Sequence, residues 1–158
     1  MDSLTWLEHQ GLLHPSVGAE PFAPAPTLQA LLPRLCHAGR LLGGLSAASD
    51  LRPDELIGPL ASAIGGTGAA LKVLDVREAP VSELWVMPRR GVEVRWAVPD
   101  LRALVDHLND ATRGDATARR VAVLGEWESA LQLWCLSRQS LATLVRRRDF
   151  TPENAAAL

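Results

Sequence analysis

The 158-residue sequence predicts an α+β protein with an antiparallel sheet of about five strands and helices packed on one face. Two observations predict it. Apolar residues recur at helical spacing before residue 68, whereas the later half carries short runs of β-branched and aromatic residues separated by turn residues. Those runs form hairpin-like groups, each followed by a helical stretch, and hairpins are antiparallel. The expected order is therefore α-α-β-β-β-α-β-β-α, behind a short N-terminal helix and a proline-rich linker.

The first 26 residues are expected to form an arm. The segment MDSLTWLEHQGLL can fold as a short amphipathic helix with Trp6 and Leu7 near its apolar side, and four prolines then favour extended backbone up to residue 26. Such a helix can be mobile on its linker, or it can lie in a groove of its own chain or of a neighbour. The predicted domain organisation is an arm at 1–26, a single α+β domain at 27–150 and a tail at 151–158.

Two helices interrupted by prolines are predicted next. The first runs through residues 28–42 after Thr27 as N-cap, and the second runs through residues 51–64. Each ends at a pair of glycines. Because proline lacks the backbone N–H and clashes with the preceding turn, Pro33 is expected to kink or split the first helix and Pro59 to disturb the second. Two bent helices packed against each other are the expected result.

The second half of the chain predicts two hairpins. The predicted strands are 69–76, 83–87, 91–98, 119–124 and 130–136. Apolar and polar residues alternate in the third of these strands, so one face should meet a core and the other should meet water. A helix from residue 100 to about residue 114 follows the first hairpin, and a helix through residues 141–148 follows the second.

This order of helices and strands resembles that of type III secretion chaperones and their relatives. Those proteins pair into dimers and hold other proteins. The resemblance lies in the order of elements, and it implies a protein-binding module that works as a homodimer in a chaperone-like or adaptor role.

The composition bounds the class of protein. An apolar content of 47% with 22% charged residues is ordinary for a folded globular protein. No apolar run reaches the roughly 20 residues that cross a bilayer, and the start MDSLTWLEH has acids where an export signal has basic residues. We therefore expect a cytoplasmic protein with no membrane contact. The net charge of −2 gives no general attraction for nucleic acid, and the two cysteines are expected to be buried thiols.

The stretch GEWES, residues 125–129, is predicted to form the tip of the second hairpin. With the chain turning at Gly125-Glu126, Trp127 lies on or near the loop, where it either folds back onto the sheet or protrudes. Tryptophan is favoured at protein interfaces, since it buries a large rigid surface at small entropic cost. Glu126 and Glu128 would then favour a partner with basic residues. The predicted partner contacts are Trp127, Glu126 and Glu128, together with Trp6 and Leu7 on the arm.

A second hypothesis from another class is a nucleic-acid or anion binder. Paired arginines occur at a hairpin turn, at the start of a strand and at the end of the last helix, and they could converge into one patch. The residues of this hypothesis are Arg89, Arg90, Arg119, Arg120, Arg146 and Arg147.

A third hypothesis is an enzyme that uses Asp106, His107 and Asp110, because these residues could form a small carboxylate-imidazole site. The same residues lie opposite the apolar stripe of the predicted helix, so the sequence favours a solvated helix face over a site. The glycine-rich stretch at 64–68 follows a helix and precedes a strand, the reverse of a nucleotide-binding turn, and no Gly-x-Ser-x-Gly motif occurs. We expect neither a cofactor nor a metal, and the sequence favours a binding protein over an enzyme.

Overall fold

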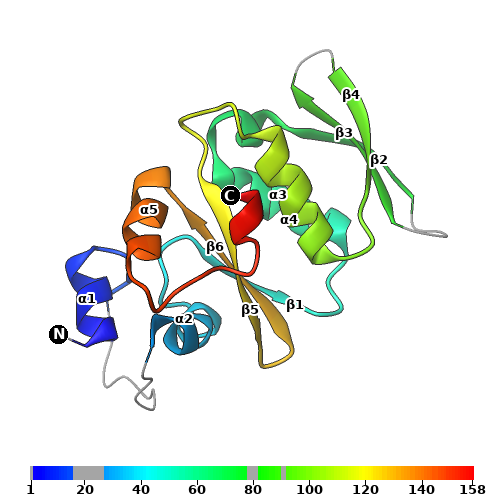
Figure 1. Cartoon of the computed structure of the whole chain (residues 1–158). Helices are drawn as coiled ribbons and strands as arrows, with labels where there is room; N and C mark the ends of the chain where they lie inside the picture. Colours follow the sequence, from blue (N-terminus) through cyan, green and yellow to red (C-terminus); the bar gives the residue numbers. More distant parts are fainter. Residues whose placement is uncertain (1, 16–26, 78–81, 90–91) are drawn as a thin grey trace.

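A computed structural model describes residues 2–15, 27–77, 82–89 and 92–158 (Figure 1). The α+β class, the antiparallel pairing and the approximate order of elements are confirmed. The α-helices are α1 (Ser3–His9), α2 (Leu28–His37), α3 (Pro53–Ile64), α4 (Leu101–Ala111) and α5 (Arg138–Arg146), with short 3-10 helices η1 (Gly66–Ala70) and η2 (Ala155–Ala157). The strands are β1 (Gly44–Ala48), β2 (Lys72–Arg77), β3 (Glu83–Arg89), β4 (Val92–Ala97), β5 (Arg120–Trp127) and β6 (Ala130–Leu136).

The strands of the described ranges form two antiparallel sheets of three, and not one sheet of about five. The central sheet has the order β1-β6-β5, with Leu45 opposite Leu133 and Val121 opposite Cys135. The outer sheet has the order β2-β3-β4. The strand that the sequence did not predict, β1, is short and, apart from Leu45, made of small residues, and it pairs with β6 along its whole length.

The central sheet is covered on both faces, so the prediction of helices on one face is wrong. Helices α1, α2 and α5 lie on one side of this sheet, and α3 and α4 lie on the other (Figure 1). Trp134 and Leu136 of β6 belong to the cluster with α2, whereas Leu133 and Cys135 belong to the cluster with α3 and α4. Every residue of β6 is buried for this reason. A strand covered on one face would instead alternate between buried and exposed residues.

The outer sheet has one covered face and one open face. Leu84, Val86 and Trp96 point into the cluster with α3 and α4. On the opposite face Trp85 lies between two cations, with the Cζ atoms of Arg77 and Arg95 each 5.6 Å from its ring centroid. This sheet therefore closes one side of the core and leaves its other side to solvent.

Helix α2 ends earlier than predicted. The helix continues through Pro33 and ends at His37, because Gly39 (φ 74°) closes it. The N–H of Arg40 donates to the carbonyl of Leu35 at 2.9 Å and the N–H of Gly39 to that of Cys36 at 3.0 Å, a Schellman arrangement. Helix α3 likewise continues past a proline. The two helices belong to clusters on opposite faces of the central sheet, so the expectation that they pack together is wrong.

Both ends of the described chain pack onto the central sheet. Leu7 of α1 is fully buried among residues of α2 and α5. Near the C-terminus the N–H of Glu153 donates to the carbonyl of Val123 at 2.9 Å, which places the tail along β5. The proline-rich linker at 16–26 lies outside the described residues. In the ranges that are described, no helix combines the length and the apolar character needed to cross a membrane.

Candidate functional site

The hairpin that joins β5 to β6 turns three residues later than predicted. Glu128 and Ser129 both have positive φ, 52° and 59°, as a type I′ turn requires. Gly125 (φ 112°) lies instead in a β-bulge, where the register with β6 shifts. Trp127 is therefore the last residue of β5, paired with Ala130, and it stands immediately before the turn.

Trp127 is exposed on 37% of its surface, the only exposed tryptophan among the described residues. The guanidinium of Arg34 on α2 lies over its ring, with Cζ 5.1 Å from the ring centroid. The flanking Glu126 and Glu128 are both exposed, and Glu126 accepts a 3.4 Å hydrogen bond from Arg102. The three hairpin residues that the sequence singled out thus lie together on the molecular surface.

Polar side chains of α2, β1 and β6 surround this tryptophan. Gln132 is fully buried, and its amide donates to the carbonyl of Trp127 at 3.2 Å and to His37 Nδ1 at 3.4 Å. His37 is in turn 3.2 Å from the hydroxyl of Ser46. We call Arg34, His37, Ser46 and Trp127 the hairpin surface, to which the buried Gln132 is bonded. It joins the end of the hairpin to α2 and to the edge strand β1.

The two predicted arm residues lie elsewhere. Leu7 is fully buried and Trp6 is half-buried, with the Cζ atom of Arg147 4.7 Å from its ring centroid. Helix α1 lies beside α5, far from the tip of the β5–β6 hairpin (Figure 1). Trp6 and Leu7 therefore do not form one surface with Trp127.

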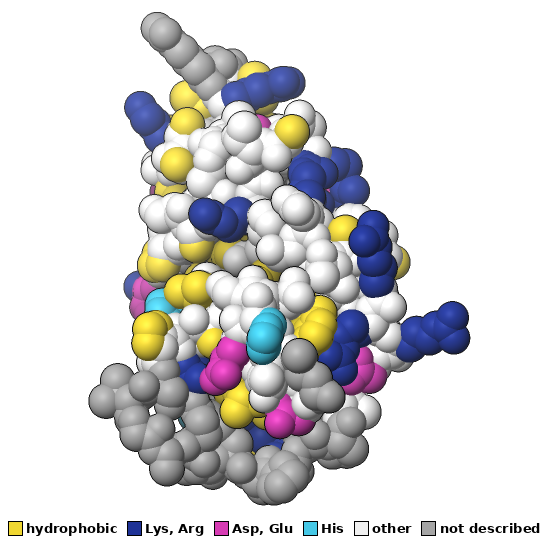
Figure 2. Space-filling model, turned by 90° about the vertical axis from the view of Figure 1, so that its left-hand side faces the viewer, with side chains coloured by type: hydrophobic (Ala, Val, Ile, Leu, Met, Phe, Trp, Pro, Cys, Tyr) yellow, Lys and Arg dark blue, Asp and Glu magenta, His cyan; other side chains and the backbone are white. Residues whose placement is uncertain are grey.

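The arginines of the second hypothesis do not converge. Arg89 lies at the end of β3, whereas Arg146 and Arg147 lie at the end of α5, on the opposite side of the molecule (Figure 1). Arg147 is paired with Asp149 at 3.1 Å. Figure 2 shows the face with α1, where basic side chains are spread apart with other side chains between them. Arg90 lies outside the described residues.

Of the pair at the start of β5, one arginine is internal. Arg120 is buried, and its guanidinium donates to the carbonyl of Asn109 at 2.8 Å and to that of Ala157 at 3.4 Å. Burial, together with repulsion from Arg138 and other nearby arginines, lowers the pKa of Arg120 from its ordinary value. Arg119 is exposed and donates to the carbonyl of Ala63 at 3.3 Å. Arg120 therefore has a structural role in this arrangement and is not available to an anion in solution.

The three residues of the enzyme hypothesis point in different directions. His107 stacks on Trp96, with ring centroids 5.0 Å apart and an interplanar angle of 4°, and its Nε2 is 2.9 Å from the carbonyl oxygen of Ala97. Asp110 forms an ion pair with Arg113 at 2.8 Å. Asp106 lines a different hollow. Across the described residues, no group of three or more histidine, cysteine, aspartate or glutamate side chains is placed to hold a metal ion.

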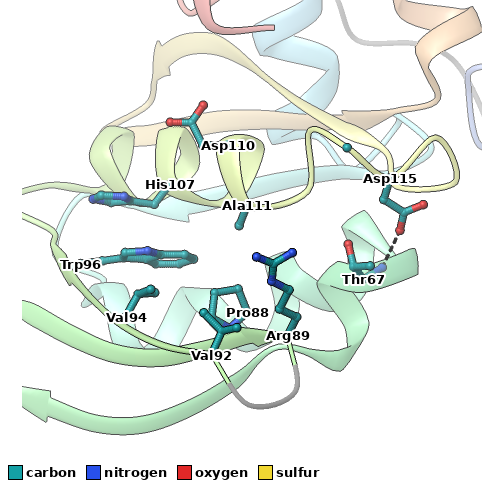
Figure 3. Close-up of a pocket in the computed structure, with 11 residues that line it drawn as sticks. Thr67, Pro88, Arg89, Val92, Val94, Trp96, His107, Asp110, Ala111 and Asp115 are labelled. Carbon is teal, nitrogen blue, oxygen red and sulfur yellow. Dashed lines mark hydrogen bonds between the residues drawn. The ribbon is translucent and has the colours of Figure 1, made fainter.

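A cleft of about 640 Å³ is the site that the sequence did not predict. It lies between α4 and the β3–β4 ribbon, with the Trp96–His107 stack at one end and Arg89 pointing into it (Figure 3). Its lining residues are Thr67, Pro88, Arg89, Val92, Val94, Trp96, His107, Asp110, Ala111, Gly114 and Asp115. The alternating pattern of β4 placed Trp96 on a covered face, but no sequence signal indicated that α4 crosses this face at a distance that leaves a cleft.

A hydrogen-bonded turn fixes one wall of this cleft. The carboxylate of Asp115 accepts from the hydroxyl and the N–H of Thr117 at 2.7 and 2.9 Å, and from the N–H of Thr67 at 2.7 Å. These hydrogen bonds, led by that of the Thr117 hydroxyl, hold the pKa of Asp115 well below its usual range. Gly66 (φ 55°) lies against this carboxylate so closely that a Cβ atom would collide with it. The turn ties η1 to the segment that follows α4.

The cysteines are buried, as expected, and offer no nucleophile. Burial raises the pKa of Cys36 to about 11 and that of Cys135 to about 12. The thiol of Cys36 also contacts the carbonyl of Leu133 at 3.4 Å. Because the thiolate is the reactive form, both groups are inert near neutral pH.

Comparison of the chain with protein-family models, with curated proteins and with solved structures gives no match. The resemblance to type III secretion chaperones therefore rests on the order of elements alone.

Proposed function

We propose that this protein is a cytoplasmic protein-binding module whose partner docks on the hairpin surface. The observation that carries the proposal is the exposed indole of Trp127, held beside Arg34 at the end of a buried hairpin. Tryptophan and arginine are the residues that most often dominate the energy of protein interfaces. Here the two are already in contact before any partner binds.

The rigid hairpin that carries Trp127 favours tight binding of a partner. All of β6, and β5 from Arg120 to Gly125, are buried, so Trp127 extends from a rigid element and not from a loop. The contact with Arg34 further restricts its ring. A side chain that is already ordered loses less conformational entropy on binding, which leaves more of the contact energy as affinity.

The acidic residues next to Trp127 indicate the charge of the partner. Glu126 and Glu128 are both exposed beside the indole, and Glu128 stands in the turn itself. A partner with basic residues around an apolar pocket would complement this arrangement. A homodimer with an adaptor-like or chaperone-like role is part of the same proposal, and it is motivated by the resemblance in element order.

Site-specific cross-linking tests the proposal. A photoreactive residue in place of Glu128 is expected to give an adduct with a distinct protein in cells of the native host, and the adduct should be lost in a Trp127→Ala background. The same residue in place of Val145, which is 49% exposed on α5, serves as the matched control and should give none. Adducts of equal yield at both positions, or none at position 128, would refute the proposal. An adduct with the mass of two chains would identify the partner as a second copy.

A further inference from the structure

The cleft beside α4 has features of a ligand site that are independent of the hairpin surface. Arg89 is exposed at the end of β3, and its guanidinium points into the cleft between Trp96 and Thr67 (Figure 3). Among the described residues the guanidinium has no ion-pair or hydrogen-bond partner. Other arginines, such as Arg113 and Arg147, are paired with carboxylates. The cleft thus holds a cation whose five donors have no partner in the part of the chain that the structure describes.

The walls next to Arg89 are apolar and already formed. Pro88, Val92 and Val94 lie below the guanidinium, and the indole of Trp96 stands at its side under His107 (Figure 3). The stack with His107 fixes the orientation of the indole. A volume of about 640 Å³ falls within the range of small-molecule sites. The cleft therefore suits a ligand with a flat apolar body.

The two acidic residues of the cleft are engaged elsewhere. Asp110 points away from the cleft (Figure 3) and is paired with Arg113 at 2.8 Å. Asp115 accepts three hydrogen bonds from Thr67 and Thr117. Neither neutralises Arg89, but their charges at the rim disfavour a ligand with many negative charges, such as a nucleic acid. The positive charge of Arg89 and the negative charges at the rim together favour a ligand that carries one negative charge and places it at Arg89.

We propose that this cleft binds a small organic carboxylate whose flat apolar body lies against Trp96 and whose carboxylate is held by Arg89. The guanidinium fork matches a carboxylate with two parallel hydrogen bonds, which fixes the orientation of the ligand as well as its position.

The probe for this proposal is 1-naphthoate, with 1-naphthamide as its neutral counterpart of the same shape. Two-dimensional NMR of the full chain follows the indole N–H of Trp96, and the expected Kd for naphthoate is about 1 mM. Arg89→Gln should weaken naphthoate binding at least about tenfold, since a charge-assisted pair of hydrogen bonds is lost. Arg95→Gln, an exposed arginine on the opposite face of the same sheet, is the matched control and should bind as the unaltered chain does.

The arms of this experiment separate the alternatives. Equal affinity for naphthoate and naphthamide, or equal affinity of the Arg89→Gln and Arg95→Gln variants, would overturn the role of Arg89. The absence of any shift of the Trp96 resonance at about 20 mM naphthoate would overturn the site itself. Tighter binding of phenyl phosphate than of naphthoate would overturn the carboxylate as the preferred anion. The dispersion of the amide spectrum of each variant verifies that it is folded.

Discussion

The side chain of Asn109 makes with Val121 the two hydrogen bonds that a neighbouring strand would make. Its Oδ1 accepts from the N–H of Val121 at 2.9 Å, and its Nδ2 donates to the carbonyl of Val121 at 3.0 Å. Asn154 continues the pattern, with Oδ1 accepting from the N–H of Val123 at 2.9 Å. The outer edge of β5 is thus closed by side chains from α4 and from the tail, which prevents it from pairing with another strand.

Asn109→Leu should lower the free energy of unfolding by about 2 kcal/mol, because the buried N–H of Val121 would lose its partner. The carbonyl of Val121 would keep a 2.8 Å hydrogen bond from Asn154. Chemical denaturation followed by circular dichroism measures the change. A loss below about 0.5 kcal/mol would mean that water reaches this edge and replaces the side chain.

Removal of residues 151–158 should make the protein associate. The shortened chain would expose the N–H and carbonyl of Val123, since Asn154 and the backbone of Glu153 are their partners. An edge with free donors and acceptors is a template for strand pairing. Light scattering coupled to size-exclusion chromatography should give a larger mass than for the full chain. Glu153→Ala retains the backbone bond and serves as the control; an unchanged mass for the shortened chain would contradict the expectation.

Two tryptophans of the hairpin should respond very differently to removal. Trp127→Ala should cost less than about 1 kcal/mol of stability, because the ring is partly exposed and contributes mainly its contact with Arg34. Trp134→Ala should cost about 3–5 kcal/mol, since this ring is fully buried and its Nε1 donates to the carbonyl of Leu42 at 2.8 Å. Guanidinium unfolding compares the two. Similar losses would assign Trp127 to the core and remove the basis of the hairpin surface.

Asp115 should make the stability of the protein depend on pH in the acid range. Its pKa in the folded chain lies below the unfolded value of 3.8, so the carboxylate is ionised in both states above about pH 5 and its full contribution is present there. As the pH falls below 3.8, the unfolded chain takes up a proton that the folded chain resists, and the contribution is progressively lost.

Asp115→Asn tests this dependence. The variant should melt at a lower temperature than the unaltered chain at about pH 6, and the difference should shrink as the pH approaches about 2. Asp106→Asn, which removes an exposed carboxylate of α4, serves as the control for the loss of one negative charge. A difference for Asp115→Asn that grows on acidification would contradict a lowered pKa of Asp115 in the folded chain.

Much of the fold could be predicted because its signals are local. The alternation in Val92–Ala97 and the apolar runs on either side of GEWES identify both hairpins without any knowledge of tertiary structure. The prediction that helices cover one face of the central sheet was wrong, although β6, which is apolar except for Gln132, is itself typical of a strand covered on both faces. Strand β1 was missed because its small residues carry almost no β-propensity, and its pairing with β6 spans some 85 residues of sequence.

The sites were harder to predict because they depend on contacts between distant segments. The exposure of Trp127 follows from a turn at Glu128-Ser129, and a shift of the strand register by one residue would move its ring to the other face of the sheet. The guanidinium of Arg120 was expected to be exposed to solvent. It is instead buried, and it donates hydrogen bonds to the carbonyls of Asn109 and Ala157. The cleft requires α4 to lie over β4, which no local pattern specifies.

Cys36 and Cys135 should resist alkylation in the folded protein. Their pKa values of about 11 and about 12 leave at most about one thiol in a thousand ionised near pH 8, and burial blocks access to the sulfur atoms. Iodoacetamide followed by mass spectrometry should therefore add no label to the native chain within a time that labels both cysteines in guanidinium. Cys36 lies in the cluster with α2 and Cys135 in the cluster with α3 and α4, so the two thiols report on opposite faces of the central sheet. Rapid labelling of Cys36 alone would locate a local opening at the α2 side, where the hairpin surface lies, and would contradict the rigidity on which the proposed docking of a partner depends.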